Sequence, residues 1–136
     1  HMNMITCAIA NDGLLMKPRF VDRVLSANGS IVKIFENEEY ARLLTPEESD
    51  VLTELMIGGV NEGTATKLKT DAYQAAGKTG SAEYNGVKED SHAWFTGFAP
   101  ADDPEIAVTI IIEGIGSGGD YSAPIAKRIF DAYFAE

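Results

Sequence analysis

The sequence predicts an α+β fold in which a three-stranded antiparallel sheet is flanked by helices. From residue 72 onward, three β-prone runs follow one another with short turns between them, which favours an antiparallel meander. Helix start and stop signals bound apolar segments on either side of these runs. The chain has 136 residues, 45% of them hydrophobic, which is enough for one domain with a core.

The first two elements expected are the end of a helix and a β-hairpin. Residues 3–10 are apolar and stop at Asn11-Asp12-Gly13, a typical helix terminus. Because the chain opens inside this helix, we expect it to be a fragment of a longer protein. We interpret His1-Met2 as a cloning scar and leave it out of the fold. Two β-prone runs around Asn28-Gly29 predict a hairpin over residues 19–35.

A helix is predicted over residues 46–60. Thr45 is its N-cap, Pro46 occupies the first helical position, and Glu48 completes a capping box. Its apolar stripe is expected to consist of Val51, Leu52, Leu55 and Met56.

The sheet is expected over residues 72–113, in the three runs 72–82, 92–99 and 106–113. Asn85-Gly86 falls in the loop after the first run, and residues 100–104 make the second turn. The third run is apolar nearly throughout, so we expect both of its faces to be covered.

A closing helix is predicted over residues 122–134, after a glycine-rich link at 114–119. Pro124 lies in its first turn. The residues expected to line its apolar face are Ile125, Ile129, Ala132 and Tyr133.

Composition excludes several classes of function. The formal net charge of −10 argues against nucleic acid and against an anionic membrane surface as partners. No stretch approaches the roughly 20 apolar residues of a membrane span. Cys7 is the single cysteine, so no intramolecular disulfide forms, and its apolar surroundings predict a small buried side chain. His1 and His92 lie too far apart in sequence to suggest ligand spacing, and we expect no metal and no cofactor.

The tripeptide Lys78-Thr79-Gly80 is the strongest candidate for a functional motif. A lysine near a serine nucleophile can relay protons or stabilise developing negative charge. The adjacent hydroxyl can bind a carboxylate, and glycine lets a substrate lie close to the strand. The next backbone N–H, that of Ser81, can serve as one oxyanion donor. These features suit acyl transfer on a peptide-like substrate that lies along a strand edge.

Two other interpretations compete for the same residues. Residues 72–79 look like a phosphate-binding loop whose first glycine is replaced by alanine. Such a loop must lead into a helix, and Gly80 with the following Asn85-Gly86 does not start one. The remaining alternative is an ordinary β-hairpin in which Lys78 is simply solvated, and the tripeptide alone favours it.

The neighbouring blocks favour the catalytic interpretation. In order, they are Ala8-Ile9-Ala10-Asn11-Asp12-Gly13, Lys17-Pro18, Glu62-Gly63-Thr64-Ala65-Thr66, Ala76-Gly77-Lys78-Thr79-Gly80-Ser81-Ala82, His92-Ala93-Trp94-Phe95-Thr96-Gly97-Phe98-Ala99-Pro100 and Ala123-Pro124-Ile125-Ala126-Lys127. With these blocks, the chain resembles the C-terminal part of a penicillin-binding protein transpeptidase domain, most like the monofunctional class B type. The resemblance covers nearly the whole chain. It implies that residues 3–136 form an incomplete transpeptidase fold of the penicillin-binding and β-lactamase kind.

The resemblance also implies an activity and roles for individual residues. The family crosslinks peptidoglycan through an acyl-serine formed from a D-Ala-D-Ala stem peptide, and β-lactams acylate the same serine. Lys78 matches the lysine of the third family motif. Thr79, with the hydroxyl of Ser81, would bind the substrate carboxylate, Gly80 would leave room along the strand, and the Ser81 N–H would be half of the oxyanion hole. The parent protein would work outside the bacterial cytoplasmic membrane and be anchored in it, whereas the fragment itself would be soluble.

The family nucleophile, the serine of Ser-x-x-Lys on a helix, is expected to be absent from this chain. Ser30-Ile31-Val32-Lys33 matches in letters, but positions three apart in a strand point to opposite faces. Ser26-Ala27-Asn28 lies in the same turn and precedes it, the reverse of the family order. We therefore expect that the fragment alone is not acylated. The missing N-terminal half should cover one sheet face, so its absence predicts a homo-dimer or a domain swap.

The remaining expectations concern packing and a second class of function. His92 is expected to play a cross-strand structural role, and Trp94 and Phe98 are expected to pack on the sheet. The alternative function is a non-catalytic α+β module that binds a peptide or partner through its sheet edge.

Overall fold

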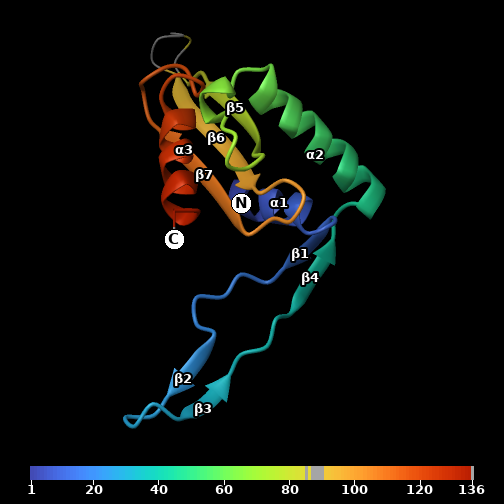
Figure 1. The fold of residues 1–136 in the computed structure, drawn as a ribbon, viewed down its shortest axis with the longest axis vertical. Coiled ribbons are helices and arrows are strands. Elements are labelled where there is room, and N and C mark those ends of the chain that lie inside the picture. Colours follow the sequence, from blue (N-terminus) through green and yellow to red (C-terminus); the bar gives the residue numbers. More distant parts are fainter. Residues whose placement is uncertain (85, 87–90, 136) are drawn as a thin grey trace.

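The computed structural model describes residues 1–84, 86 and 91–135, and its order of elements follows the predicted α+β pattern (Figure 1). In chain order, the elements are α1 (Met2–Ala10), β1 (Leu14–Met16), β2 (Arg23–Leu25), β3 (Ile31–Ile34), β4 (Glu39–Arg42), α2 (Pro46–Asn61), a short 3-10 helix (Thr66–Leu68), β5 (Ala76–Ala82), β6 (His92–Ala99), β7 (Ile106–Ile112) and α3 (Ser122–Tyr133). Asn85, expected in the loop after the first sheet strand, lies outside the described residues.

The centre of the fold is the antiparallel sheet β5-β6-β7, which confirms the predicted fold class. Successive side chains of a strand point to opposite faces, and the two faces of β6 meet different helices. On one face, the Thr96 hydroxyl lies 2.5 Å from the hydroxyl of Thr6 in α1. On the other face, the Ser122 hydroxyl of α3 donates to the carbonyl of Ala93 at 2.8 Å. The sheet is therefore a middle layer between α1 and α3.

The α2 helix begins as predicted and packs along β5. Thr45 and Glu48 exchange the two hydrogen bonds of a capping box, and Pro46 lies in the first turn. Near the other end, a methyl group added at Gly59 would lie 2.6 Å from the carbonyl oxygen of Gly77 in β5. Glycine at position 59 thus permits the close approach of the helix to the strand.

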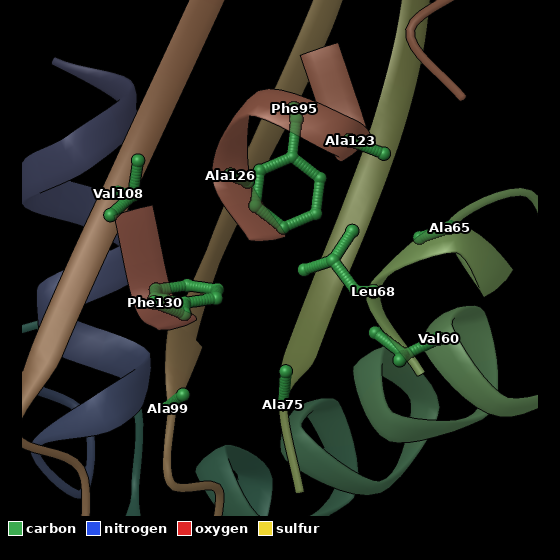
Figure 2. Close-up of a cluster of buried hydrophobic side chains, with 10 residues drawn as sticks. All are labelled: Val60, Ala65, Leu68, Ala75, Phe95, Ala99, Val108, Ala123, Ala126 and Phe130. Carbon is green, nitrogen blue, oxygen red and sulfur yellow. The ribbon is translucent and has the colours of Figure 1, made fainter. Parts of the chain in front are cut away.

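The hydrophobic core lies between the sheet, α2 and α3 (Figure 2). Phe95 and Phe130 are fully buried there. The other buried members are Val60, Ala65, Leu68, Ala75, Ala99, Val108, Ala123 and Ala126. Tyr73 meets the Phe130 ring edge-on with centroids 6.1 Å apart, and its hydroxyl donates to Asp131 at 2.8 Å.

The prediction of which residues form the buried face of the closing helix, α3, is wrong. The helix buries Ala123, Ala126 and Phe130, whereas Ile125 and Ile129 are each 38% exposed and Tyr133 is 45% exposed. Both sets of residues have helical spacing, so periodicity alone could not choose between them. Small alanine side chains let the helix approach the sheet closely, and the Phe130 ring fills the remaining space.

Three further expectations about burial fail wholly or in part. The α2 stripe is divided, because Val51 is 57% and Leu55 67% exposed whereas Leu52 and Met56 are partly buried. In β7, Ile111 is 46% exposed, because this strand lies at the edge of the sheet and α1 and α3 do not cover all of it. Cys7 is exposed rather than buried.

The predicted hairpin forms the end of a long arm that extends away from the sheet (Figure 1). Its strands, β2 and β3, pair antiparallel around a turn in which Gly29 has a φ of +84°. The base of the arm is a second antiparallel pair, β1 with β4, which the sequence analysis did not predict. Several apolar side chains of the arm are exposed, with Val32 at 66% and Phe20 at 100%.

Replacing Phe130 by alanine should destabilise the fold by about 3–5 kcal/mol, because the fully buried ring would leave a cavity. The matched change Ile129→Ala, one residue away and 38% exposed, should cost under about 1 kcal/mol. Urea unfolding followed by circular dichroism measures both. Equal losses for the two variants would contradict the orientation of α3.

Candidate active site

Lys78, Thr79, Gly80 and Ser81 lie on β5, which is an edge strand of the sheet. Lys78 and Gly80 are paired with Thr96 and Trp94 of β6 and share their face, the face of α1. Thr79 and Ser81 point to the opposite face, because side chains alternate along a strand. The four predicted site residues therefore meet at one edge but divide between two faces.

The backbone N–H and C=O groups of Thr79 and Ser81 point away from β6. The Gly77 carbonyl faces α2, so the pair Gly77–Gly97 is not joined by ladder hydrogen bonds. In an antiparallel pair of strands, such pairs alternate with hydrogen-bonded pairs. Thr79 and Ser81 lie two and four residues after Gly77, so their N–H and C=O groups also point to the outer side. The Lys78 ammonium reaches the same side, where it donates to the Thr79 carbonyl at 2.5 Å. The result is a strand edge whose outward N–H and C=O groups have a cation beside them.

A pocket of about 360 Å³ opens on the α1 side of this edge. Its lining residues are Met2, Lys78, Thr79, Gly80, Ala82, Trp94, Phe95 and Thr96. Trp94 and Met2 make its apolar part, and Lys78 brings a positive charge to it. Within the described part of the chain, Lys78 forms no ion pair. The pocket thus offers a cation and apolar surface to an anionic, partly apolar ligand.

The opposite face carries two hydroxyl groups on residues that are two positions apart. Thr79 is only 7% exposed, and its hydroxyl is hydrogen-bonded to the hydroxyl of Thr64, which follows α2. Ser81 is exposed two residues further along the same face. The Thr79 and Ser81 hydroxyls lie on the same side, and each has a hydrogen that could be donated to a carboxylate.

The glycine-rich link at 114–119 packs against this second face. A methyl group on Gly118 would lie 2.1 Å from the Trp94 carbonyl oxygen and 2.5 Å from that of Gly80. Just beyond the link, Asp120 pairs with Lys67 at 2.8 Å. Hydrogen bonds from Lys67 and Ser117 and the lysine charge hold the pKa of the Asp120 carboxyl below its usual range. At Gly118 the link therefore lies directly against the backbone of β5 and β6.

The expectations for the neighbouring strand agree with the geometry. His92 Nδ1 accepts a hydrogen bond from the Gly114 N–H at 3.1 Å, and its ring stacks on Tyr84 with centroids 4.5 Å apart. These contacts are structural. Phe98 is fully buried, and Trp94 is half-buried in the pocket wall.

The structure separates both accidental motif matches from the site. Ser30 and Lys33 belong to the arm, at the opposite end of the molecule from β5 (Figure 1). Lys33 lies over the Phe35 ring, 4.3 Å from its centroid. Ser26 donates to Asn28 Oδ1 at 2.5 Å within the turn, as the preference of these residue types for turns predicts.

Sequence reasoning missed the contact between Thr64 and Thr79. In the sequence, Thr64 stands out only as part of the block at residues 62–66. No local pattern reveals the contact, because 15 residues separate the two hydroxyls. The glycines at 118 and 119 were a signal of close backbone approach, although their spacing did not identify what they approach.

The described residues contain neither a cluster of metal ligands nor a helix that could span a membrane. Within residues 1–84, 86 and 91–135, no group of three or more His, Cys, Asp or Glu side chains could hold a metal ion. None of the helices in that part of the chain has the length and apolar character to cross a membrane.

Comparison with known proteins finds consistent similarity. Peptidoglycan D,D-transpeptidase PbpA of Mycolicibacterium smegmatis is 32% identical over 139 aligned residues, which cover 97% of this chain. The crystal structure of the D,D-transpeptidase domain of a peptidoglycan glycosyltransferase from Eggerthella lenta superposes with a TM-score of 0.87 at 31% identity, over 98% of this chain and 31% of that one. The ceftriaxone acyl-enzyme complex of penicillin-binding protein A from M. tuberculosis gives 0.85 at 29% identity, over 96% and 31%.

The chain spans only 28% of the length of the M. smegmatis relative. The family model described as the penicillin binding protein transpeptidase domain matches residues 1–131. Because this match covers nearly all of the 136 residues, the chain belongs to the family of penicillin binding protein transpeptidase domains.

Proposed function

We propose that this chain is the C-terminal part of the transpeptidase domain of a peptidoglycan D,D-transpeptidase and supplies one wall of its active site. The observation that carries the proposal is the outer edge of β5. There the Ser81 N–H, the Lys78 ammonium and the Thr79 carbonyl meet on the same side. The printed names of the relatives, among them D,D-transpeptidase PbpA and a β-lactam acyl-enzyme complex, support the same activity.

The open edge of β5 suits a stem peptide that lies along it as an added strand. Main-chain hydrogen bonds to Thr79 and Ser81 would hold the peptide. The substrate carboxylate would bind the hydroxyls of Thr79 and Ser81. Gly80 has no side chain, so the peptide can come close to the strand.

The chemical step begins when a serine hydroxyl attacks the carbonyl carbon of the penultimate D-Ala. The carbonyl oxygen gains negative charge, which the Ser81 N–H would stabilise as one oxyanion donor. Lys78 would stabilise charge or relay the proton that passes from the serine to the departing amine. The peptide bond breaks, terminal D-Ala leaves, and the acyl-serine is then attacked by an acceptor amine to form the crosslink. A β-lactam would acylate the same serine by opening its ring.

We propose that the attacking serine belongs to the parent protein upstream of this chain. The location of the Ser-x-x-Lys match supports this, because residues 30–33 belong to the arm around β2 and β3, which extends away from β5 (Figure 1). We further propose that His1 and Met2 derive from cloning, so that the Met2 side chain in the pocket is not a ligand contact. The parent would act outside the cytoplasmic membrane and be anchored in it.

The isolated chain should form no covalent adduct with penicillin, whereas the parent protein with its upstream sequence should gain one drug molecule per chain. Intact mass spectrometry after incubation with fluorescent penicillin measures both. A stoichiometric adduct on Ser30 of the isolated chain would overturn the assignment of an upstream nucleophile. An unlabelled parent would instead favour the non-catalytic peptide-binding module.

In the parent protein, Ser81→Pro should slow acylation by about 100- to 1000-fold, because proline has no N–H to donate to the oxyanion. The fold should tolerate proline, since this N–H points away from β6 and makes no ladder bond. Ser81→Ala keeps the N–H and is the matched control, expected to lose less than tenfold. Stopped-flow acylation kinetics measure the rates, and similar losses in both variants would refute the oxyanion role.

The isolated chain should self-associate as a homo-dimer or a domain swap. The reason differs from the one expected from the sequence, because α1 and α3 lie against the two faces of the sheet. Exposed apolar surface is found instead on α2, at Val51 and Leu55, and we propose that the rest of the domain covers it in the parent. Sedimentation coefficients in analytical ultracentrifugation should rise with concentration, and Leu55→Glu should weaken this rise. A single monomeric species at every concentration would count against the proposal.

A further inference from the structure

The hydroxyl of Thr79 has one hydrogen-bond partner among the described side chains, the hydroxyl of Thr64. Thr79 is nearly buried, at 7% exposure, while Thr64 lies at the surface. A hydroxyl has one hydrogen to donate and two lone pairs that accept. Between two hydroxyls, one donates, and the other keeps its hydrogen for a different partner.

We propose that Thr64 is a positioning residue that donates its hydroxyl hydrogen to Thr79. Thr79 then accepts from Thr64 and keeps its own hydrogen for the carboxylate of the substrate or β-lactam. This inference rests on the function proposed above, in which Thr79 binds that carboxylate. The reverse direction would use the Thr79 hydrogen on Thr64 and leave only lone pairs to face an anion. A bound carboxylate therefore selects the first arrangement.

The backbone holds Thr64 in place for this role. The N–H of the next residue, Ala65, donates to the Gly59 carbonyl at 3.0 Å, and Ala65 is buried. From the other side, Gly119 packs so closely that an added methyl group would lie 2.4 Å from the Thr64 carbonyl oxygen. The ion pair between Lys67 and Asp120, at 2.8 Å, joins the same two segments. Thr64 is thus positioned by α2 and by the glycine-rich link.

Energetics favour a role beyond packing. Replacing both partners of a buried neutral hydrogen bond by apolar groups of the same shape is nearly neutral for stability. A valine at position 79 could fill the same space without a polar group, so packing alone does not require the two hydroxyls. Hydrogen bonds in a chain strengthen one another, so donation from Thr64 would make the Thr79 hydroxyl a better donor to an anion.

The test measures acylation of the full parent protein by penicillin G and by its methyl ester, which has no carboxylate. Thr64→Val should slow acylation by the free acid about fivefold, the equivalent of one neutral hydrogen bond, and leave the ester rate unchanged. Thr64→Ser, which keeps the hydroxyl, should restore most of the free-acid rate. Thr66→Val, an exposed threonine two residues away, is the matched control and should behave as wild type.

A double-mutant cycle with Thr79→Val completes the test. Once the Thr79 hydroxyl is gone, adding Thr64→Val should cause no further loss with the free acid. Equal slowing of acid and ester by Thr64→Val, or no slowing of either, would overturn the inference. Additive losses in the cycle would overturn it as well. If penicillin does not label the wild-type parent, the proposed function itself is refuted. Failure of the proposed function can therefore be distinguished from failure of the Thr64 inference.

Discussion

The position of β5 at the edge of the sheet is the constraint on which the candidate site depends. An edge strand has a row of unpaired N–H and C=O groups, which proteins usually cover or block. Here α2 covers the edge at Gly77, where Gly59 lets the helix come close. The helix ends at Asn61, short of Thr79 and Ser81, whose N–H and C=O groups also face outward. The length of α2 therefore decides how much of the β5 edge this helix covers.

The two faces of β5 have different surroundings at this edge. On the α1 side, Lys78 and Gly80 line an open pocket with Trp94. On the α3 side, Phe95 lies over Gly77 and Gly97, where an added methyl group would come within 2.7 Å of the ring. This contact anchors β5 to the core, and Thr79 is held beside it by Thr64. The closely packed α3 face thus supports the more accessible α1 face. Such support keeps site groups in position.

Much of the fold and part of the site could be predicted from local patterns. The capping box at Thr45 and the β-prone runs of the sheet have short-range causes, and the structure contains both. The buried face of α3 could not be chosen, because two sets of apolar residues share the helical period and only the sheet selects between them. The β1-β4 pair was missed because its strands are short and distant in sequence.

The sequence by itself determined the chemical groups of the site, their order on one strand and the class of fold, because these follow from adjacent residues and from alternation along a strand. Tertiary structure alone decided which part of the edge α2 covers, which face each group meets and which hydroxyl adjoins Thr79. These depend on contacts between segments far apart in the chain, such as Thr64 with Thr79 and Gly118 with Gly80. Local sequence does not reveal such contacts, because they depend on how the helices pack on the sheet.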